Sequence, residues 1–118
     1  MQTLSRKSLA ELGHEDFRPH LNTTFTIEDQ QGGTLDVELL SVDAYPHLTP
    51  AFAKRTTFAL LFQDVHGRTL PSWVYNIRHK KMGLIEGVLV TAVSVPEYAR
   101  AQLKEGVTCP AFFEVVFN

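Results

Sequence analysis

The sequence predicts a mainly β fold: about six antiparallel strands that form a small barrel or a two-layer sheet, with short helices near the N-terminus and before the last strand. Two observations carry this prediction. Runs rich in Phe, Val, Leu and Thr recur along the chain, and turn-forming residues such as Gly, Pro, Asn and Asp separate them. The runs 84–95 and 112–117 are apolar at both even and odd positions, so both faces of these strands need a cover.

The chain begins with a segment that is expected to be flexible, residues 1–7, and two short helical turns follow. Residues 8–13 have the form of a capping box followed by a glycine that can end the turn. A second turn is expected over 14–21, where Phe17 and Leu21 lie four positions apart and therefore share one face. This face is expected to pack down onto the sheet.

The next two elements are predicted from the alternation of apolar and polar residues. Residues 24–28 alternate, residues 30–33 form a turn, and residues 35–42 alternate again. In the second of these strands the apolar positions change parity at Leu39 and Leu40. A β-bulge, or a passage of the strand from one face to another, explains such a change.

Residues 56–95 are interpreted as a three-stranded meander, in which each strand pairs with the next one along the chain. Alternate residues of the first two strands are expected to face the core: Phe58, Leu60 and Phe62, then Trp73, Tyr75 and Ile77. Residues 79–83 make the tight connection to the third strand. Residues typical of helix ends predict that Pro96 to Lys104 form a short amphipathic helix that covers a sheet edge. The last strand follows at 111–118.

Composition bounds the class of protein. With 118 residues the chain is expected to be a single β domain, 1–118, with one core. A net charge of −2 with interspersed acids and bases gives no electrostatic case for binding nucleic acid. The single cysteine, Cys109, excludes an intrachain disulfide, and no apolar run approaches the ~20 residues of a membrane helix. No leader pattern is recognisable at the N-terminus, so the cytoplasm is the expected location.

No residue pattern predicts a catalytic, metal or cofactor site. His14 and His20 lie six positions apart, whereas two histidines of a zinc-binding helix lie four apart. Cys109 has no neighbouring base that would activate it as a nucleophile. The basic run 78–81 is interpreted as a solvated hairpin turn. The remaining histidines are expected to be solvated beside turns or in a loop: His47, His66 and His79.

The loop 44–55 is the feature that leans most toward a function, because it is long and carries aromatic residues between two prolines. Its aromatic residues either stay exposed or tuck under the loop as a small satellite cluster. Together with the apolar excess of the later strands, the loop yields six candidate residues for an interaction surface: Tyr45, His47, Phe52, Trp73, Phe112 and Val116.

The order of these segments resembles a family of short, uncharacterised bacterial proteins, a domain of unknown function. The matching residues span roughly 14–118 and are core and turn positions: Asp16-Phe17, Phe25, Phe58-Ala59-Leu60-Leu61-Phe62, Leu70-Pro71 with Tyr75, His79 with Gly83, Val90 to Val95, and Phe117-Asn118. The resemblance implies no catalytic residues, and it implies an assembly role near phage-tail-collar-like genes. The chain departs from the family pattern at Asn22, where a glycine is usual, and over 97–110, which is longer than typical.

Three functions follow from the sequence, in order of preference. The first is a non-enzymatic structural or protein-interaction module that associates with itself or with a protein partner, in a phage-tail-like or related assembly. The second is a small-molecule-binding β barrel, with Trp73 and Tyr75 lining an interior pocket. The third is a hydrolase-like enzyme that uses His47, His66 or Cys109.

Overall fold

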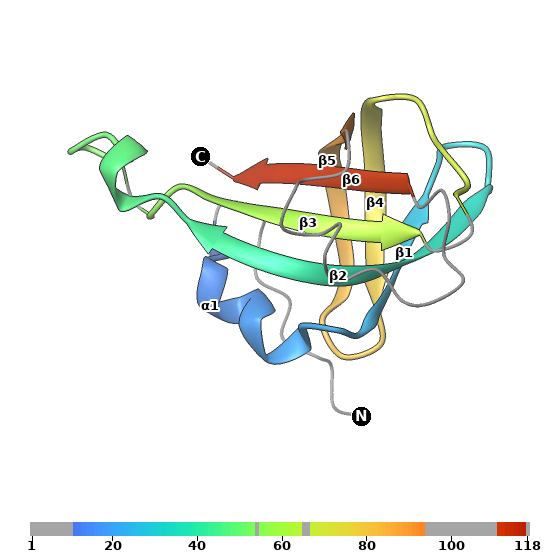
Figure 1. The fold of residues 1–118 in the computed structure, drawn as a ribbon, viewed down its shortest axis with the longest axis horizontal. Helices are drawn as coiled ribbons and strands as arrows, with labels where there is room; N and C mark the ends of the chain where they lie inside the picture. The colour runs from blue at the N-terminus through green and yellow to red at the C-terminus, as the bar shows by residue number, and fades with distance from the viewer. Residues whose placement is uncertain (1–10, 54, 65–66, 94–110, 118) are drawn as a thin grey trace.

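The computed structural model describes residues 11–53, 55–64, 67–93 and 111–117. Within these residues six antiparallel strands close into a small barrel, in the order β1-β2-β3-β6-β5-β4 (Figure 1). The prediction of a mainly β fold with about six antiparallel strands is confirmed. The strands are β1 (Thr24–Glu28), β2 (Thr34–Ala44), β3 (Phe58–Asp64), β4 (Trp73–His79), β5 (Gly83–Val93) and β6 (Ala111–Phe117).

The strand order differs from the expected meander over 56–95. β3 pairs with β2 and β6, and β4 pairs with β1 and β5, so β3 and β4 follow each other in sequence but are not neighbours. The barrel therefore consists of two three-stranded meanders, β1-β2-β3 and β4-β5-β6, joined along β3–β6 and β1–β4. Every residue of β3 is buried, and the apolar β6 lies beside it, whereas the half-exposed β4 does not.

The apolar positions of the second strand change parity, which predicts a β-bulge, and this bulge is confirmed. Leu39 lies opposite Phe62, and Ser41 lies opposite Leu61, so Leu40 is an extra residue on β2. Before the bulge, Leu39 points into the barrel and is buried. After it, the inward side chains of β2 continue on even-numbered positions, beginning with Val42.

Two short helical turns close one end of the barrel, α1 (His14–Phe17) and the 3-10 turn η2 (Arg18–His20). The ring of Phe17 is buried and its centroid lies 5.6–6.4 Å from those of Phe25, Phe58 and Phe117. Leu21 packs against the same core, as the shared face predicted. Asn22 then takes a left-handed backbone with φ 65°, which explains why glycine and asparagine both suit this position.

The outer face of the sheet carries a second, smaller cluster. Leu61 and Phe112 are buried there, and the half-buried Leu40 and Val93 pack against them. Phe112, a candidate interaction residue, is 2% exposed and is buried within this cluster. The core face expected for β3, formed by Phe58, Leu60 and Phe62, is confirmed, and the other face of β3 is buried as well.

Several expected features lie outside the described residues. These are the flexible start at 1–7, most of the turn at 8–13, the Pro96–Lys104 helix, His66 and Cys109. In the described part of the chain, no helix has the length and apolar character needed to cross a lipid bilayer.

Candidate functional site

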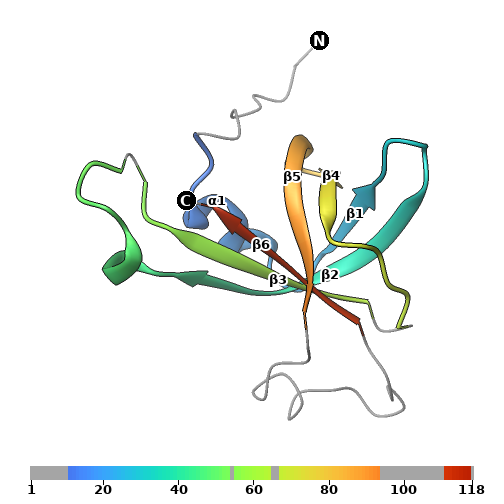
Figure 2. The ribbon, with the colours of Figure 1, turned by 90° about the horizontal axis from the view of Figure 1, so that it is seen from above.

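The connection between β2 and β3, residues 45–57, projects beyond one end of the barrel (Figures 1 and 2). We call it the projecting loop. Thr49 fixes its base, because its hydroxyl donates to the carbonyl of Tyr45 at 2.9 Å and accepts the N–H of Thr57 at 2.9 Å. The N–H of Tyr45 also donates to the carbonyl of Thr57 at 2.7 Å. These bonds hold the loop in one shape, which a sequence of loop-forming residues does not by itself predict.

The projecting loop presents apolar side chains to solvent. Phe52 is 89% exposed and Leu48 is 62% exposed. His47 is exposed within the 3-10 turn η3 (Pro46–Leu48), while Tyr45 is half-buried at the base of the loop, with its ring centroid 6.1 Å from that of His47. Of the two alternatives for this loop, Phe52 therefore follows the exposed one and does not tuck into a satellite cluster.

A groove opens at the opposite end of the barrel, where the β1–β2 turn meets the connection from β3 to β4. Its volume is about 410 Å³, and we call it the Trp73 groove. The hydroxyl of Tyr75 donates to the carbonyl of Pro71 at 2.7 Å, which ties the connection to β4. Burial and the nearby Asp29 carboxylate raise the pKa of Tyr75. The groove is lined by Asp29, Gln30, Gln31, Leu70, Pro71, Trp73, Val74 and Tyr75.

Trp73 does not line an interior pocket, so that part of the small-molecule hypothesis is wrong. Trp73 shares the inward parity of Tyr75 and Ile77, and both of those are buried. As the first residue of β4, however, Trp73 lies at the barrel mouth, and it is 63% exposed. The interior of the barrel is filled by a continuous cluster of buried apolar side chains, as is usual for small barrels.

Exposed apolar side chains also occur on the outer face of β4, β5 and β6. Val74 lies directly opposite Leu89, and Leu89 is 59% exposed. Val116, a candidate interaction residue, is exposed on β6. Within the described residues β5 and β6 pair at three positions, from Thr91 to Val93, which makes this the shortest seam described.

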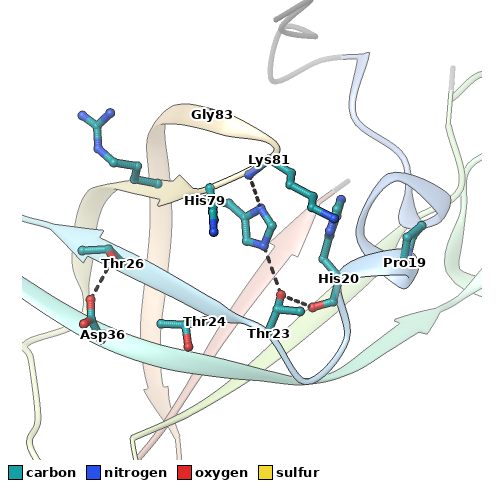
Figure 3. Close-up of a pocket in the computed structure, with 11 residues that line it drawn as sticks. Pro19, His20, Thr23, Thr24, Thr26, Asp36, His79, Lys81 and Gly83 are labelled. Carbon is teal, nitrogen blue, oxygen red and sulfur yellow. Dashed lines mark hydrogen bonds between the residues drawn. The ribbon is translucent and has the colours of Figure 1, made fainter.

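A hollow of about 640 Å³ lies outside the barrel, between η2 and the β4–β5 turn (Figure 3). His79 forms one wall, and the hydroxyl-bearing residues Thr23, Thr24 and Thr26 lie along the β1 side. Arg78 at its rim donates to the Glu28 carboxylate at 3.0 Å, so this cation is already paired. The remaining lining residues are Pro19, His20, Asp36, Lys80, Lys81 and Gly83.

His79 is a structural residue of this hollow. Its Nδ1 accepts the backbone N–H groups of Lys81 at 3.0 Å and Met82 at 3.2 Å, so Nδ1 carries no proton and Nε2–H points at the Thr23 hydroxyl, 3.0 Å away (Figure 3). The ring centroid lies 4.3 Å from that of Phe25 and 4.5 Å from that of His20. Burial lowers the pKa of His79, and the neighbouring His20 and Lys81 lower it further. The expectation that His79 is solvated is wrong, since it is 6% exposed.

The other residues with candidate chemistry are engaged in packing or turns. His14 accepts a hydrogen bond from Arg18 Nε at 3.3 Å, and its ring meets the Phe58 ring edge-on at 6.2 Å. Among the described residues no group of three or more His, Cys, Asp or Glu side chains could hold a metal ion.

The sequence patterns missed two residues that shape these surfaces. Thr49 could not be recognised, because a threonine whose hydroxyl holds a loop together has no characteristic spacing from its partners in the sequence. A signal for His79 does exist. Its side chain accepts the N–H groups of the residues two and three positions later, as an Asp or Asn side chain does in an Asx turn, but here the acceptor is an imidazole nitrogen.

The fold and its surfaces define a small, side-chain-filled antiparallel β barrel with apolar groups exposed at both ends. Comparison with family models identifies the family: the chain belongs to the domain of unknown function DUF6916, whose model matches residues 12–103. This finding confirms the resemblance to a domain of unknown function. Comparisons with curated proteins and with solved structures gave no match.

Proposed function

We propose that this chain is a non-enzymatic protein-interaction module that associates with itself, in the cytoplasm. The observation that carries the proposal is the set of large apolar side chains that stay exposed although the barrel core is complete. Among the described residues they are Leu48, Phe52, Trp73, Val74, Leu89 and Val116. Large exposed apolar groups that gather on a few surfaces mark interaction sites more often than single scattered ones do.

The chemistry of the described histidines supports a non-enzymatic role. His79 uses both ring nitrogens to hold the β4–β5 turn and Thr23, which gives the ring a structural role. His14 accepts from Arg18, and His47 projects with η3 into solvent. Self-association would also suit the assembly role, near phage-tail genes, that the family resemblance implies.

Molar mass measured by light scattering over a wide range of protein concentrations tests the proposal. We expect the mass to rise with concentration, and a strictly monomeric particle at the highest soluble concentration would reject self-association. A double variant, Phe52→Ser with Leu89→Ser, is expected to associate more weakly. Its matched control, Ala51→Ser with Ala92→Ser, changes exposed neighbours on the same loop and strand and should behave as the unchanged protein.

A second candidate function is small-molecule binding, now in the hollow outside the barrel rather than in its interior. The hollow has a volume of about 640 Å³, which lies in the range of ligand sites, and Lys80 and Lys81 at its rim favour an anionic ligand. Thermal unfolding in the presence of a library of carboxylates and phosphates tests this candidate. Stabilisation that is lost in Lys81→Ala supports it, and a flat response across the library rejects it.

A further inference from the structure

The hollow outside the barrel has two walls, η2 and the β4–β5 turn, and one chain of hydrogen bonds holds both in place (Figure 3). The Thr23 hydroxyl donates to the carbonyl of His20 and lies 3.0 Å from Nε2 of His79. On the other side of the same ring, Nδ1 of His79 accepts the N–H of Lys81 at 3.0 Å. The backbones that carry His20 and Lys81 are therefore fixed before a ligand binds, which lowers the entropy lost on binding.

Three nitrogen-bearing side chains of the lining are available to a ligand. Within the described residues, the side-chain nitrogens of His20, Lys80 and Lys81 form no hydrogen bond or ion pair. Lys80 and Lys81 extend from the turn that His79 holds, and His20 extends from the opposite wall. The two walls thus offer two ammonium groups and one imidazole to the same space.

The other charged residues of the lining already have partners. Arg78 pairs with Glu28 at 3.0 Å, and the carboxylate of Asp36 accepts the Thr26 hydroxyl at 2.7 Å. Figure 3 shows Thr26 and Asp36 together at the end of the hollow away from His20. The one carboxylate of the lining is therefore separated from the His20 end, where an anion can approach the cations.

The electrostatics of the His20 end are positive. Burial is the main cause that lowers the pKa of His79, and the neighbouring His20 and Lys81 lower it further. Neighbours that disfavour a proton on this ring favour a negative charge beside it. The rigid walls, the unused donors and the local field all indicate an anion site.

We propose that the hollow binds a phosphate monoester of a small molecule, with the phosphate group held by Lys80, Lys81 and His20. The inference rests on the second candidate function, small-molecule binding in the hollow, and names the class of ligand. A phosphate monoester carries a charge of about −1.5 to −2 at neutral pH and three acceptor oxygens. A carboxylate has a single charge and only two oxygens. Two lysines and an imidazole N–H from two walls therefore match the phosphate better.

The remaining space of the hollow accommodates the organic part of the ligand. Its volume of about 640 Å³ exceeds the need of a phosphate group alone and lies in the range of small-molecule sites. Thr24 and Thr26 lie along the β1 side of this space, with Asp36 beside Thr26. Hydroxyl and carboxylate groups there suit a ligand that carries hydroxyl groups of its own.

Isothermal titration calorimetry with ribose 5-phosphate tests the assignment, with ribose and acetate as comparison ligands. We expect ribose 5-phosphate to bind, and ribose and acetate to bind at least about tenfold more weakly, because each lacks the dianionic group. Binding should also weaken as salt is added, since the lysines are exposed and their charges are screened.

Variants of the β4–β5 turn locate the site. Lys80→Ala and Lys81→Ala should each weaken the binding of ribose 5-phosphate about tenfold, because each removes a charge-assisted hydrogen bond. Lys81→Arg keeps the cation and should bind nearly as well as the unchanged protein. Arg18→Ala is the matched control: it removes an exposed cation of η2 that donates to His14 and does not line the hollow, and it should leave the affinity unchanged. Urea unfolding checks that all four variants are folded.

The failure of this proposal and that of the second candidate function are distinguishable. No binding of ribose 5-phosphate, together with a flat response to carboxylates, overturns both. Carboxylates that bind as tightly as ribose 5-phosphate, and lose their binding in Lys81→Ala, overturn the phosphate assignment alone. Equal losses in Arg18→Ala and Lys81→Ala would show unspecific attraction to a cationic surface and overturn the site. Binding to vesicles that contain phosphatidic acid, with none to ribose 5-phosphate, would overturn a free small molecule as the ligand.

Discussion

Replacement of His79 by alanine is expected to destabilise the fold strongly. The change removes three hydrogen bonds: two from the backbone N–H groups of Lys81 and Met82, and one with the Thr23 hydroxyl. A net value of about 1 kcal/mol for each bond gives a loss of about 3 kcal/mol, before any loss of packing against Phe25. For a domain of this size the melting temperature should fall by about 12 °C, at about 4 °C per kcal/mol.

Urea unfolding at neutral pH, followed by circular dichroism, measures this loss. His79→Asn is the informative companion, because an asparagine oxygen can accept the same two turn N–H groups and should recover about 1–2 kcal/mol. His20→Ala removes the neighbouring ring but none of these three bonds, and should cost less than about 1 kcal/mol. A His79→Ala protein within about 1 kcal/mol of the unchanged protein would refute the assigned role.

The same residue predicts how stability depends on pH. Burial lowers the pKa of His79 in the folded state, below its ordinary value of 6.5 in the unfolded chain. The unfolded state therefore binds the proton first as the pH falls, so the contribution of His79 is complete above about pH 6.5 and declines below it. The free energy of unfolding should drop as the pH falls below about 6.5, and the drop should be smaller in His79→Asn. Equal slopes in the two proteins would contradict this.

Three further substitutions are expected to lower the free energy of unfolding in urea. Phe62→Ala empties a fully buried position of the core and should cost about 3–5 kcal/mol, with Phe62→Leu milder. Thr49→Val leaves the N–H of Thr57 without its acceptor and should cost about 1–3 kcal/mol, whereas Thr49→Ser keeps the hydroxyl. Gly87→Ala should cost about 1 kcal/mol because Gly87 has φ 71°, and Gly87→Asn should cost less. A loss in Thr49→Ser equal to that in Thr49→Val, or no loss in Gly87→Ala, would contradict the respective explanation.

Alternation along the chain predicted which residues of β1, β2 and β4 face the core, because the two faces of a strand differ in polarity. The bulge at Leu40 was predictable for the same reason, since a single extra residue reverses the parity of everything after it. The shared face of Phe17 and Leu21 followed from helical spacing. These features depend on local periodicity, which the sequence displays directly.

The order of the strands was not predictable from periodicity. Pairing β3 with β4 assumed that successive strands are neighbours, which is common but not required. In the structure β6 lies between β3 and β5, and Leu61 of β3 meets Phe112 of β6 on the outer face. The sequence shows that both residues are apolar, but apolar character alone does not predict which two strands lie side by side.

The surfaces of the candidate site include residues whose exposure cannot be predicted from their odd or even position along a strand. Trp73 has the inward parity of Tyr75, yet it is the first residue of β4 and lies beyond the end of β1, which stops opposite Asn76, so its side chain is exposed to solvent. His79 stands at the other end of the same strand and is buried, because the β4–β5 turn folds back over its ring. Exposure at the ends of a strand is therefore set by the connections, and only the folded structure shows where these lie.

The separation of the projecting loop from the Trp73 groove is a consequence of strand connectivity. In an antiparallel barrel, successive connections alternate between its two ends. The β1–β2 turn with Gln30 and Gln31, and the β3–β4 connection with Pro71, are the first and third connections of the barrel, so both lie at the end that carries the Trp73 groove. The second connection is the projecting loop with Phe52, and it must lie at the opposite end. Substitutions within either connection can change the side chains that it presents, but they leave its end of the barrel unchanged, because that end is fixed by the order of the strands.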